Sequence, residues 1–286
     1  MKRLFCAFAA WGLLMGLTGP AKAQYMFTPI DFPGATRNFA LGINNAGQIV
    51  GQYGDGGPRH GFLRDVDGSY TTIDPPGSTS STAYGINDAG QIVGGYRDAG
   101  GTGHGFLRDV DGSYTTIDVP GSPYTEANGI NDAGQIVGYY FVDATGGHVF
   151  LLDVDGSYTT LDVPGAVQTA AGGINNAGQI VGWYSDAPGT YHGFLLDIDG
   201  RYTTINVPGS THTEAHGIND AGQIVGYDAT GGPGFLLDVD GSYTIFDVPG
   251  AANGTVAYGI NDAGQIVGYY LDAAGTFHGF LATPGG

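Results

Sequence analysis

Cysteine and lysine are nearly missing from this chain, and their absence removes one kind of chemistry. The single cysteine, Cys6, and both lysines, Lys2 and Lys22, fall within the first 23 residues. From residue 24 onward, disulfides and thiol chemistry are therefore excluded. The sequence also lacks a G-x-S-x-G, an H-E-x-x-H and a phosphate-binding glycine loop, which are signatures of common hydrolases, zinc proteases and nucleotide-binding proteins. No segment has a sustained helical period.

Residues 1–23 have the features of a secretory signal peptide. Lys2 and Arg3 form a positive start, an apolar run extends from Leu4 to Leu17, and residues 21–23 form a small-x-small cleavage site. The apolar run is too short for a typical membrane-spanning helix. We therefore expect a secreted protein, extracellular or periplasmic, with a single domain over residues 24–286 and no membrane insertion.

Positive charge is also scarce. Without residues 1–23, six arginines remain against 27 acidic side chains, a net charge of −21. Such a surface repels phosphate backbones and anionic lipids, which argues against nucleic-acid and membrane partners. It is compatible with cations and with neutral polymers.

The most abundant feature is a ten-residue motif, G-I-N-[DN]-A-G-Q-I-V-G, that occurs six times at intervals of 42 to 44 residues. A fixed period of this size is typical of repeat architectures. The six copies begin at Gly42, Gly85, Gly129, Gly173, Gly217 and Gly259.

Each repeat predicts four short β-strands. In the third copy they are Ala127–Asn131, Gln135–Tyr140, His148–Val154 and Ser157–Val163. An Asn-Asp-Ala-Gly turn follows the first strand, and an Asp-Gly turn follows the third. Four antiparallel strands in about 44 residues are typical of a propeller blade.

The two ends of the chain complement each other. Residues 25–34 resemble a fourth-strand segment and precede the first full repeat, whereas the last repeat stops after its third strand, at His278–Leu281. The sequence therefore predicts an all-β fold, a six-bladed β-propeller in which an N-terminal strand completes the last blade. A β-helix or another all-β repeat is the alternative.

The motif and a downstream His-Gly-Phe-Leu make the chain resemble the HAF-type extracellular repeats of bacteria over nearly its whole length after residue 23. His-Gly-Phe replaces the His-Ala-Phe of the family in four copies. The third copy reads His148-Val149-Phe150, and Pro233 stands at the histidine position of the fifth. The resemblance implies export and a β-propeller-like repeat fold, and it adds little about a ligand or a reaction.

The strand order places two sets of turns on one rim of such a ring. The turns after the first and third strands hold 14 of the 25 aspartates and hardly vary between repeats. The opposite rim is built from second-to-third-strand loops and blade-to-blade crossings, and it differs from repeat to repeat. Variation on one rim of a rigid frame indicates a binding face. Neutral drift in unconstrained loops is the alternative.

The variable rim supplies the candidate ligand-binding residues. Its aromatic rings are suited to stacking on sugars, and the alternative is that they pack between blades. The predicted partner is an extracellular glycan or protein, bound by a monomer. The candidates are Tyr124, Trp183, Tyr184, Tyr191, His212 and Arg97.

An enzyme is the rival interpretation. The only two glutamates, Glu126 and Glu214, fall at matching crossings two repeats apart, and His216 follows Glu214 closely. Two carboxyl groups about 5–10 Å apart are the general acid and base of a glycosidase, so a lyase or glycosidase at the channel mouth is one hypothesis. Two exposed loop carboxylates are the plainer interpretation. A structural matrix protein without a soluble ligand is a third alternative.

No cofactor is expected, and calcium is the one metal to consider. Asp109 and Asp111 resemble the start of a calcium loop but lack its later ligands, and hairpin turns favour the same residues. Five histidines that open third strands suggest a metal ring, but equivalent positions on different blades are normally too far apart for one ion. We expect each to bond a neighbouring backbone group instead: His60, His104, His148, His192 and His278.

Overall fold

The computed structural model describes residues 25–142, 146–187 and 189–285. The predicted signal peptide lies outside these residues. All 24 secondary-structure elements of these residues are β-strands, so the all-β prediction is confirmed. The same residues contain no helix of the length and apolarity that a membrane span requires.

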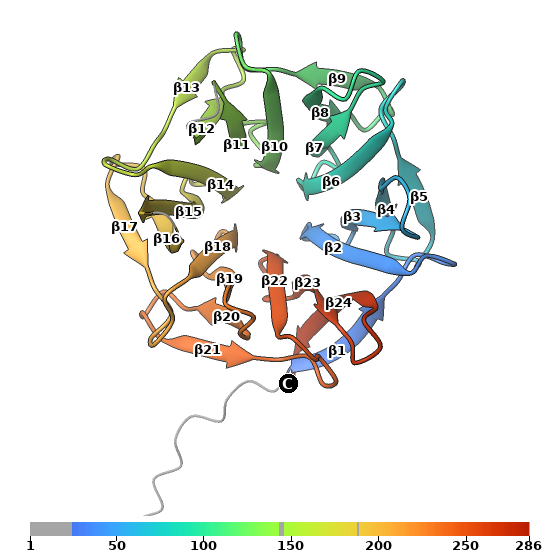
Figure 1. Cartoon of the computed structure of the whole chain (residues 1–286), viewed down its shortest axis with the longest axis vertical. Helices are drawn as coiled ribbons and strands as arrows, with labels where there is room; N and C mark the ends of the chain where they lie inside the picture. Colours follow the sequence, from blue (N-terminus) through green and yellow to red (C-terminus); the bar gives the residue numbers. More distant parts are fainter. Residues whose placement is uncertain (1–24, 143–145, 188, 286) are drawn as a thin grey trace, which may run out of the picture.

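Antiparallel pairings group the strands into four-stranded units around a central axis (Figure 1). The strands nearest the axis are β2 (Arg37–Ile43), β6 (Ser80–Ile86), β10 (Tyr124–Ile130), β14 (Gln168–Ile174), β18 (Thr213–Ile218) and β22 (Thr255–Ile260). The second strands are β3 (Ile49–Gly54), β7 (Ile92–Arg97), β11 (Ile136–Phe141), β15 (Ile180–Ala187), β19 (Ile224–Asp228) and β23 (Ile266–Leu271). The third strands are β4 (His60–Arg64), β8 (Gly103–Arg108), β12 (Gly147–Leu152), β16 (Thr190–Leu196), β20 (Gly234–Leu237) and β24 (Phe277–Pro284). The outer strands are β5 (Tyr70–Ile73), β9 (Tyr114–Ile117), β13 (Tyr158–Thr160), β17 (Tyr202–Ile205), β21 (Tyr243–Phe246) and β1 (Tyr25–Ile30).

The strand at the start of the described chain pairs with the strand at its end. β1 runs antiparallel to β24, from Tyr25 opposite Pro284 to Ile30 opposite Gly279. Ile30 is fully buried and packs in one hydrophobic cluster with residues of β2 and β3. The pairing therefore adds an outer strand to the sheet of β22, β23 and β24.

Strand order follows the prediction, and the strand ends of the third repeat differ by one or two residues except at two ends, which differ by three. β10 begins three residues before the predicted start, because Tyr124, Thr125 and Glu126 pair with the end of β11. Tyr124 also forms a parallel bridge with Gly103 of the preceding unit. β13 ends at Thr160 rather than Val163. Beyond it the backbone N–H of Val149, on the neighbouring strand β12, donates to the Asp162 carboxylate (3.0 Å). This N–H is therefore not available for a further backbone bond with the outer strand.

The hydrophobic core lies between neighbouring units. Val93 of one unit, for example, packs against Ala127, Ile136 and Phe150 of the next. Each third strand supplies one fully buried phenylalanine, and burying such a ring contributes roughly 1.5–3 kcal/mol. The six rings are Phe62, Phe106, Phe150, Phe194, Phe235 and Phe280.

Two glycines of the repeated motif are required by close approach of other atoms. A Cβ on Gly138 would overlap the carbonyl oxygen of Glu126 and lie 2.9 Å from the ring of Phe150. A Cβ on Gly129 would lie 3.0 Å from the Cα of Gly173 in the next unit. Only glycine permits both approaches, which explains why these positions are glycine in every copy.

The motif asparagine both builds the turn after the inner strand and joins neighbouring units. Asn131 Nδ2 donates to Gln135 Oε1, and the Gln135 N–H donates to Asn131 Oδ1, both at 2.9 Å. Gly134 closes the turn with φ 85°. Asn131 Nδ2 also donates to the carbonyl of Asn175, 3.3 Å away in the next unit. The equivalent bond occurs at all six junctions and returns to the first unit: Asn44 to Asn87, Asn87 to Asn131, Asn131 to Asn175, Asn175 to Asn219, Asn219 to Asn261, and Asn261 to Asn44.

The following motif position forms a second cycle of hydrogen bonds. Two copies carry asparagine there and four carry aspartate. Asn45 Nδ2 donates to Asp88 and Asp262, at 2.8 Å each. Asn176 Nδ2 donates at 2.7 Å each to Asp132 and Asp220. Each carboxylate thus lies beside one amide donor, which offsets the repulsion between like charges.

The histidines that open third strands bond side chains rather than backbone, an aspartate in four cases and Asn206 for His192, so that expectation is wrong. His104 Nδ1 donates to Asp118 at 2.9 Å, and His148 Nδ1 donates to Asp162 at 2.7 Å. The partner lies 14 residues further on, at the end of the outer strand, where the sheet brings it opposite the histidine. His278 has its equivalent partner, Asp31, at the other end of the chain (2.9 Å).

Gly138→Ala should destabilise the fold. The new methyl group would overlap the Glu126 carbonyl, and forcing such overpacking costs about 1–3 kcal/mol. Urea unfolding followed by tryptophan fluorescence would measure the free energy of unfolding. Gly57→Ala is the matched control, because its Cβ would meet nothing closer than an oxygen of Asp55 at 3.7 Å. Equal stability of the two variants would contradict the packing argument.

His278 should make the protein lose stability as pH rises. Burial acts to lower the pKa of His278, but hydrogen bonds and charge from Asp31 and Asp272 outweigh it and raise the pKa above its usual 6.5. This contribution is fully present below pH 6.5 and is lost as pH rises through the raised value. The difference in urea midpoint between the wild type and His278→Gln should therefore shrink from pH 5.5 to 8.5.

His192→Gln serves as the control for this pH effect. Its Nδ1 bonds the uncharged amide of Asn206, and its one carboxylate contact, Asp186, is longer (3.6 Å from Nε2) than either carboxylate contact of His278, so its variant should show a smaller pH effect. A difference that stays constant with pH for His278→Gln would show that this histidine does not couple folding to protonation.

Candidate functional site

Each inner strand has a β-bulge immediately before the motif glycine. In β10 the pairing with β11 shifts between Ala127 and Gly129, so Asn128 has no opposite residue. Bulges turn a side chain away from the regular alternation of a strand. Here the bulge residues line the central channel: Leu41, Tyr84, Asn128, Gly172, His216 and Tyr258.

The two glutamates lie on inner strands, so their expected placement in exposed crossings is wrong. Glu126 is in β10 and Glu214 is in β18. Both face the channel, two residues before the bulge, and the Glu214 side chain is only 16% exposed. The reason is that these strands begin earlier than the sequence pattern indicates.

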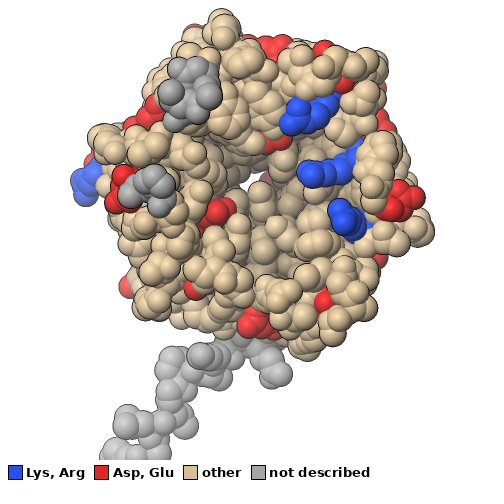
Figure 2. Space-filling model, in the orientation of Figure 1, with Lys and Arg blue, Asp and Glu red and all other residues tan. Residues whose placement is uncertain are grey.

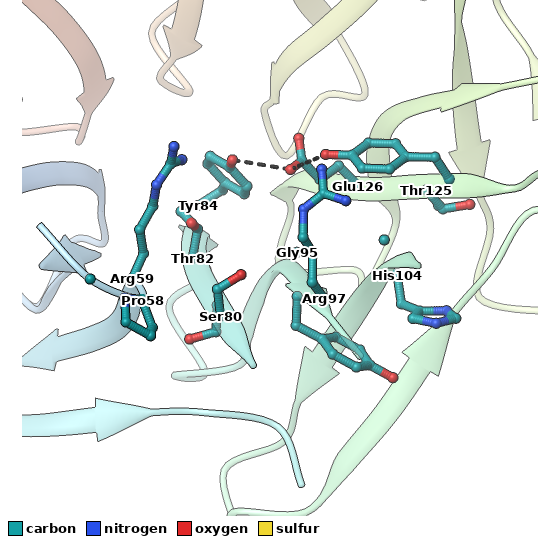
Figure 3. A pocket seen from close by; sticks show the side chains of 15 residues that line it. Pro58, Arg59, Ser80, Thr82, Tyr84, Gly95, Arg97, His104, Thr125 and Glu126 are labelled. Atoms are coloured by element: carbon teal, nitrogen blue, oxygen red, sulfur yellow. Dashed lines mark hydrogen bonds between the residues drawn. The ribbon is translucent and has the colours of Figure 1, made fainter. Parts of the chain in front are cut away.

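Glu126 is held by tyrosine hydroxyls (Figure 3). Tyr124 donates to Oε1 of Glu126 at 2.7 Å, and Tyr84 donates to the same oxygen at 3.3 Å. Burial, with the charge of Glu126, raises the pKa of both hydroxyls and that of Tyr139. These tyrosines therefore remain protonated at neutral pH and act as hydrogen-bond donors.

Glu214 has a similar environment, with one tyrosine replaced by histidine. Tyr227 donates to Oε2 of Glu214 at 3.1 Å, and His216 Nε2 lies 3.2 Å from the same oxygen. The His216 ring stacks on Tyr258, with centroids 4.1 Å apart. Burial and then the charge of Glu214 raise the pKa of Tyr227. The carboxylate and imidazole are thus held in fixed positions.

Both glutamates line one cavity of about 330 Å³, together with Asn128, Trp183 and His216. Two further cavities, of about 330 and 310 Å³, open beside it and share Arg59 and Tyr84. We call these three adjoining cavities the funnel. Figure 2 shows the central opening of the molecule on this face.

The predicted ligand-binding residues divide into three groups. Tyr124 and Arg97 lie at the edge of the funnel, with the guanidinium carbon of Arg97 5.6 Å from the Tyr124 ring centroid. Trp183 lines the funnel. Its ring contacts that of Tyr191, with centroids 5.2 Å apart, and the Tyr191 ring contacts that of His212, with centroids 5.7 Å apart. These three rings extend outward from the funnel.

Tyr184 lies apart from the other candidates. Its ring packs in the hydrophobic cluster between units, and its hydroxyl hydrogen-bonds with Thr204 at 3.0 Å. Since successive side chains of a strand point to opposite faces, Tyr184 faces away from its neighbour Trp183. Its position agrees with the alternative in which such tyrosines pack between blades.

The side chains of the candidate calcium ligands accept hydrogen bonds from backbone N–H groups of their own turn. Asp109 Oδ1 accepts from the N–H of Val110, and Asp111 Oδ1 accepts from the N–H of Ser113, both at 2.8 Å. Hydrogen bonds from Ser113 lower the pKa of Asp111. Within residues 25–142, 146–187 and 189–285, the structure gathers no group of three or more His, Cys, Asp or Glu that could hold a metal ion. Calcium binding stays a prediction.

Sequence reasoning missed the channel-facing tyrosines. Tyr84 and Tyr258 directly precede the motif glycine, and Tyr139 and Tyr269 follow the last one. The sequence did contain a sign of them: the positions directly before the first and directly after the last motif glycine vary between copies, although the motif between them is almost constant. Alternation along a strand would have placed both on one face, but the bulge was not evident from the sequence.

Comparisons with known proteins identify the fold. No protein-family model and no curated protein matches the chain. Among solved structures, a streptogramin B lyase is similar, with 11% identity, a TM-score of 0.54 and coverage of 91% of this chain and 98% of that one. A gluconolactonase from Xanthomonas campestris has 13% identity, a TM-score of 0.55 and coverage of 91% and 90%.

A carbohydrate-binding protein is also among the similar structures. A mutant of the Aleuria aurantia lectin, in complex with Fucα1-6GlcNAc, has 15% identity, a TM-score of 0.55 and coverage of 88% of this chain and 95% of that one. Since β-propeller enzymes and a lectin match almost equally well, the likeness shows a β-propeller fold and leaves the activity open.

Proposed function

We propose that this chain is an exported, monomeric binding protein that takes up an extracellular glycan or protein in its funnel. One observation carries the proposal: positions that build the ring repeat almost unchanged, while the positions facing the funnel vary between units. Three residues before the motif glycine, the six units carry Phe39, Thr82, Glu126, Ala170, Glu214 and Val256. A scaffold that needed only stability would have no use for this variety.

The proposal includes a six-bladed ring in which β1 completes the last blade. Support comes from the full register between β1 and β24 and from the burial of Ile30. The cycle of asparagine bonds, which returns from Asn261 to Asn44, also favours closure. A closed ring would hold side chains from different units in fixed relative positions, as a binding site requires.

Trp183→Ala and Tyr191→Ala should each weaken ligand binding about tenfold or more, because both remove aromatic surface continuous with the funnel. The measurement is a thermal-shift screen against glycans and extracellular proteins, followed by titration of the hits. A ligand at 100 times its Kd adds about 2.7 kcal/mol of stability.

Tyr184→Phe is the control for these variants, since it alters the neighbouring residue on the opposite face and removes only the contact with Thr204. Unchanged binding in both alanine variants would refute the funnel as the site. A screen with no shift for any ligand would favour the structural matrix role.

An enzyme is the second candidate, and the shared cavity of Glu126 and Glu214 favours it. Each carboxylate is hydrogen-bonded by groups that could also position a substrate hydroxyl, and such a pair could act as general acid and base in a lyase or glycosidase. General acid–base catalysis contributes typically 10²–10⁴-fold.

Glu126→Gln and Glu214→Gln should then each reduce kcat on any glycan that the protein cleaves by at least about 100-fold, with little change in binding. Product formation would be followed by mass spectrometry. Asp111→Asn, on the aspartate-rich rim, controls for loss of a negative charge. Turnover that survives both glutamine variants would remove these residues from the mechanism.

A further inference from the structure

The six arginines beyond residue 24 divide equally between the two faces of the ring. Arg64, Arg108 and Arg201 belong to the aspartate-rich rim, where Arg201 pairs with Asp199 at 2.9 Å. Arg37, Arg59 and Arg97 line the funnel instead. Figure 2 shows blue atoms gathered on one side of the central opening. In a chain with so few cations, this grouping of three like charges needs an explanation.

The funnel arginines form no ion pairs among the residues that the structure describes. Arg97 donates to the carbonyl oxygen of Gly101 at 2.9 Å and lies over the Tyr124 ring, and these contacts hold its guanidinium in place without neutralising it. All three side chains are exposed. Three like charges gathered beside a cavity do not stabilise the fold, so their grouping points to an anionic ligand.

The three arginines border a continuous groove. One cavity is lined by Arg59 and Arg97, the adjoining one by Arg37 and Arg59. Arg59, from the loop between β3 and β4, therefore lies where the two cavities meet. Figure 3 shows Arg59 and Arg97 on either side of the cavity that contains Tyr84 and Glu126.

The remaining lining residues suit a sugar. Tyr84 and Tyr124 place aromatic rings in the cavity lining, and Ser80 offers a hydroxyl. Glu126 accepts hydrogen bonds from Tyr84 and Tyr124 at Oε1, and a carboxylate has further acceptor capacity for a sugar hydroxyl. The same carboxylate would repel an anionic group that entered at the floor, so the ligand's charge should lie toward the arginines.

We infer that the funnel binds an acidic oligosaccharide, with a uronate carboxylate or a sulfate ester on the arginine side and sugar hydroxyls on Glu126. This inference rests on the proposed binding function and names its ligand class. Guanidinium groups bind carboxylate and sulfate through two parallel hydrogen bonds. The aspartate-rich rim lies on the other face, and charges farther apart than about 8 Å are largely screened at physiological salt.

A single acidic sugar or a short oligomer fits better than a dense polyanion. The other three arginines of the described residues lie on the opposite rim, so a long nucleic acid or heavily sulfated chain would meet no further cationic side chain on the funnel face. Three arginines along one groove match one or two anionic groups.

The test is isothermal titration with a panel of short oligosaccharides. The panel contains oligogalacturonates, oligoguluronates, sulfated oligosaccharides and, as the matched uncharged ligand, methyl-esterified oligogalacturonate. At least one acidic member should bind at least tenfold more tightly than its uncharged counterpart, and whether uronates or sulfates bind identifies the anionic group. Binding should weaken as salt is raised from 50 to 300 mM. A DNA oligonucleotide of equal charge should bind no more tightly than the uncharged sugar.

Arginine variants locate the interaction. Arg59→Gln should weaken binding of the acidic ligand at least tenfold. Arg59→Lys should bind with an affinity between those of Arg59→Gln and the wild type, because lysine keeps the charge but not the paired donors. Arg108→Gln makes the same charge change on the opposite rim and should alter Kd by less than twofold.

Three results would overturn the inference: no acidic sugar binds, the methyl ester binds equally well, or Arg108→Gln weakens binding as much as Arg59→Gln. Binding of a neutral glycan or a protein that Trp183→Ala abolishes and Arg59→Gln leaves intact would also overturn it. In that case the proposed function would stand and only the ligand class would fall.

Discussion

The side-chain amide of one asparagine in each repeat donates to the backbone carbonyl of the same asparagine in the next, and the rest of the structure depends on this contact. Six such bonds run in a cycle, at 3.1–3.3 Å, from Asn44 through Asn261 and back to Asn44. The bond is possible only because the preceding glycines let the inner strands approach each other. A Cβ on Gly42, for instance, would lie 2.6 Å from the carbonyl oxygen of Tyr84. Glycine and asparagine are therefore fixed together in each copy.

This constraint separates the scaffold from the site. The motif secures the aspartate-rich end of each inner strand, and the cores between units are filled by isoleucine, valine and phenylalanine. The bulge then directs the residue before the motif glycine into the channel and away from the cores between units. Tyr84 and His216 occupy equivalent positions and yet differ in side-chain chemistry and size. Variation at these positions changes the channel without disturbing the ring, which is the property that a repeat-based binding protein needs.

Sequence reasoning predicted local structure well and side-chain partners poorly. The turn at Asn131–Gly134 and the shared rim of the aspartate turns are confirmed, because both follow from turn chemistry and strand order. The partner of His104 was predicted wrongly, since Asp118 lies 14 residues away and meets it only through pairing of β8 with β9. Glu126 and Glu214 were recognised as unusual but assigned to loops, because a bulged strand lacks the regular alternation that marks its beginning.

The period and the strand content follow from the sequence alone, because they depend on local patterns that recur in every repeat. Export stays a prediction from the pattern of residues 1–23. The tertiary structure decided which residues of different repeats share a space. Tyr124 and Glu126 could be named from one repeat, but their contact with Tyr84 comes from the repeat before. Likewise Arg37, Arg59 and Arg97 are scattered over 61 residues of sequence and lie along one groove only because two neighbouring units present their variable ends to the same side of the ring.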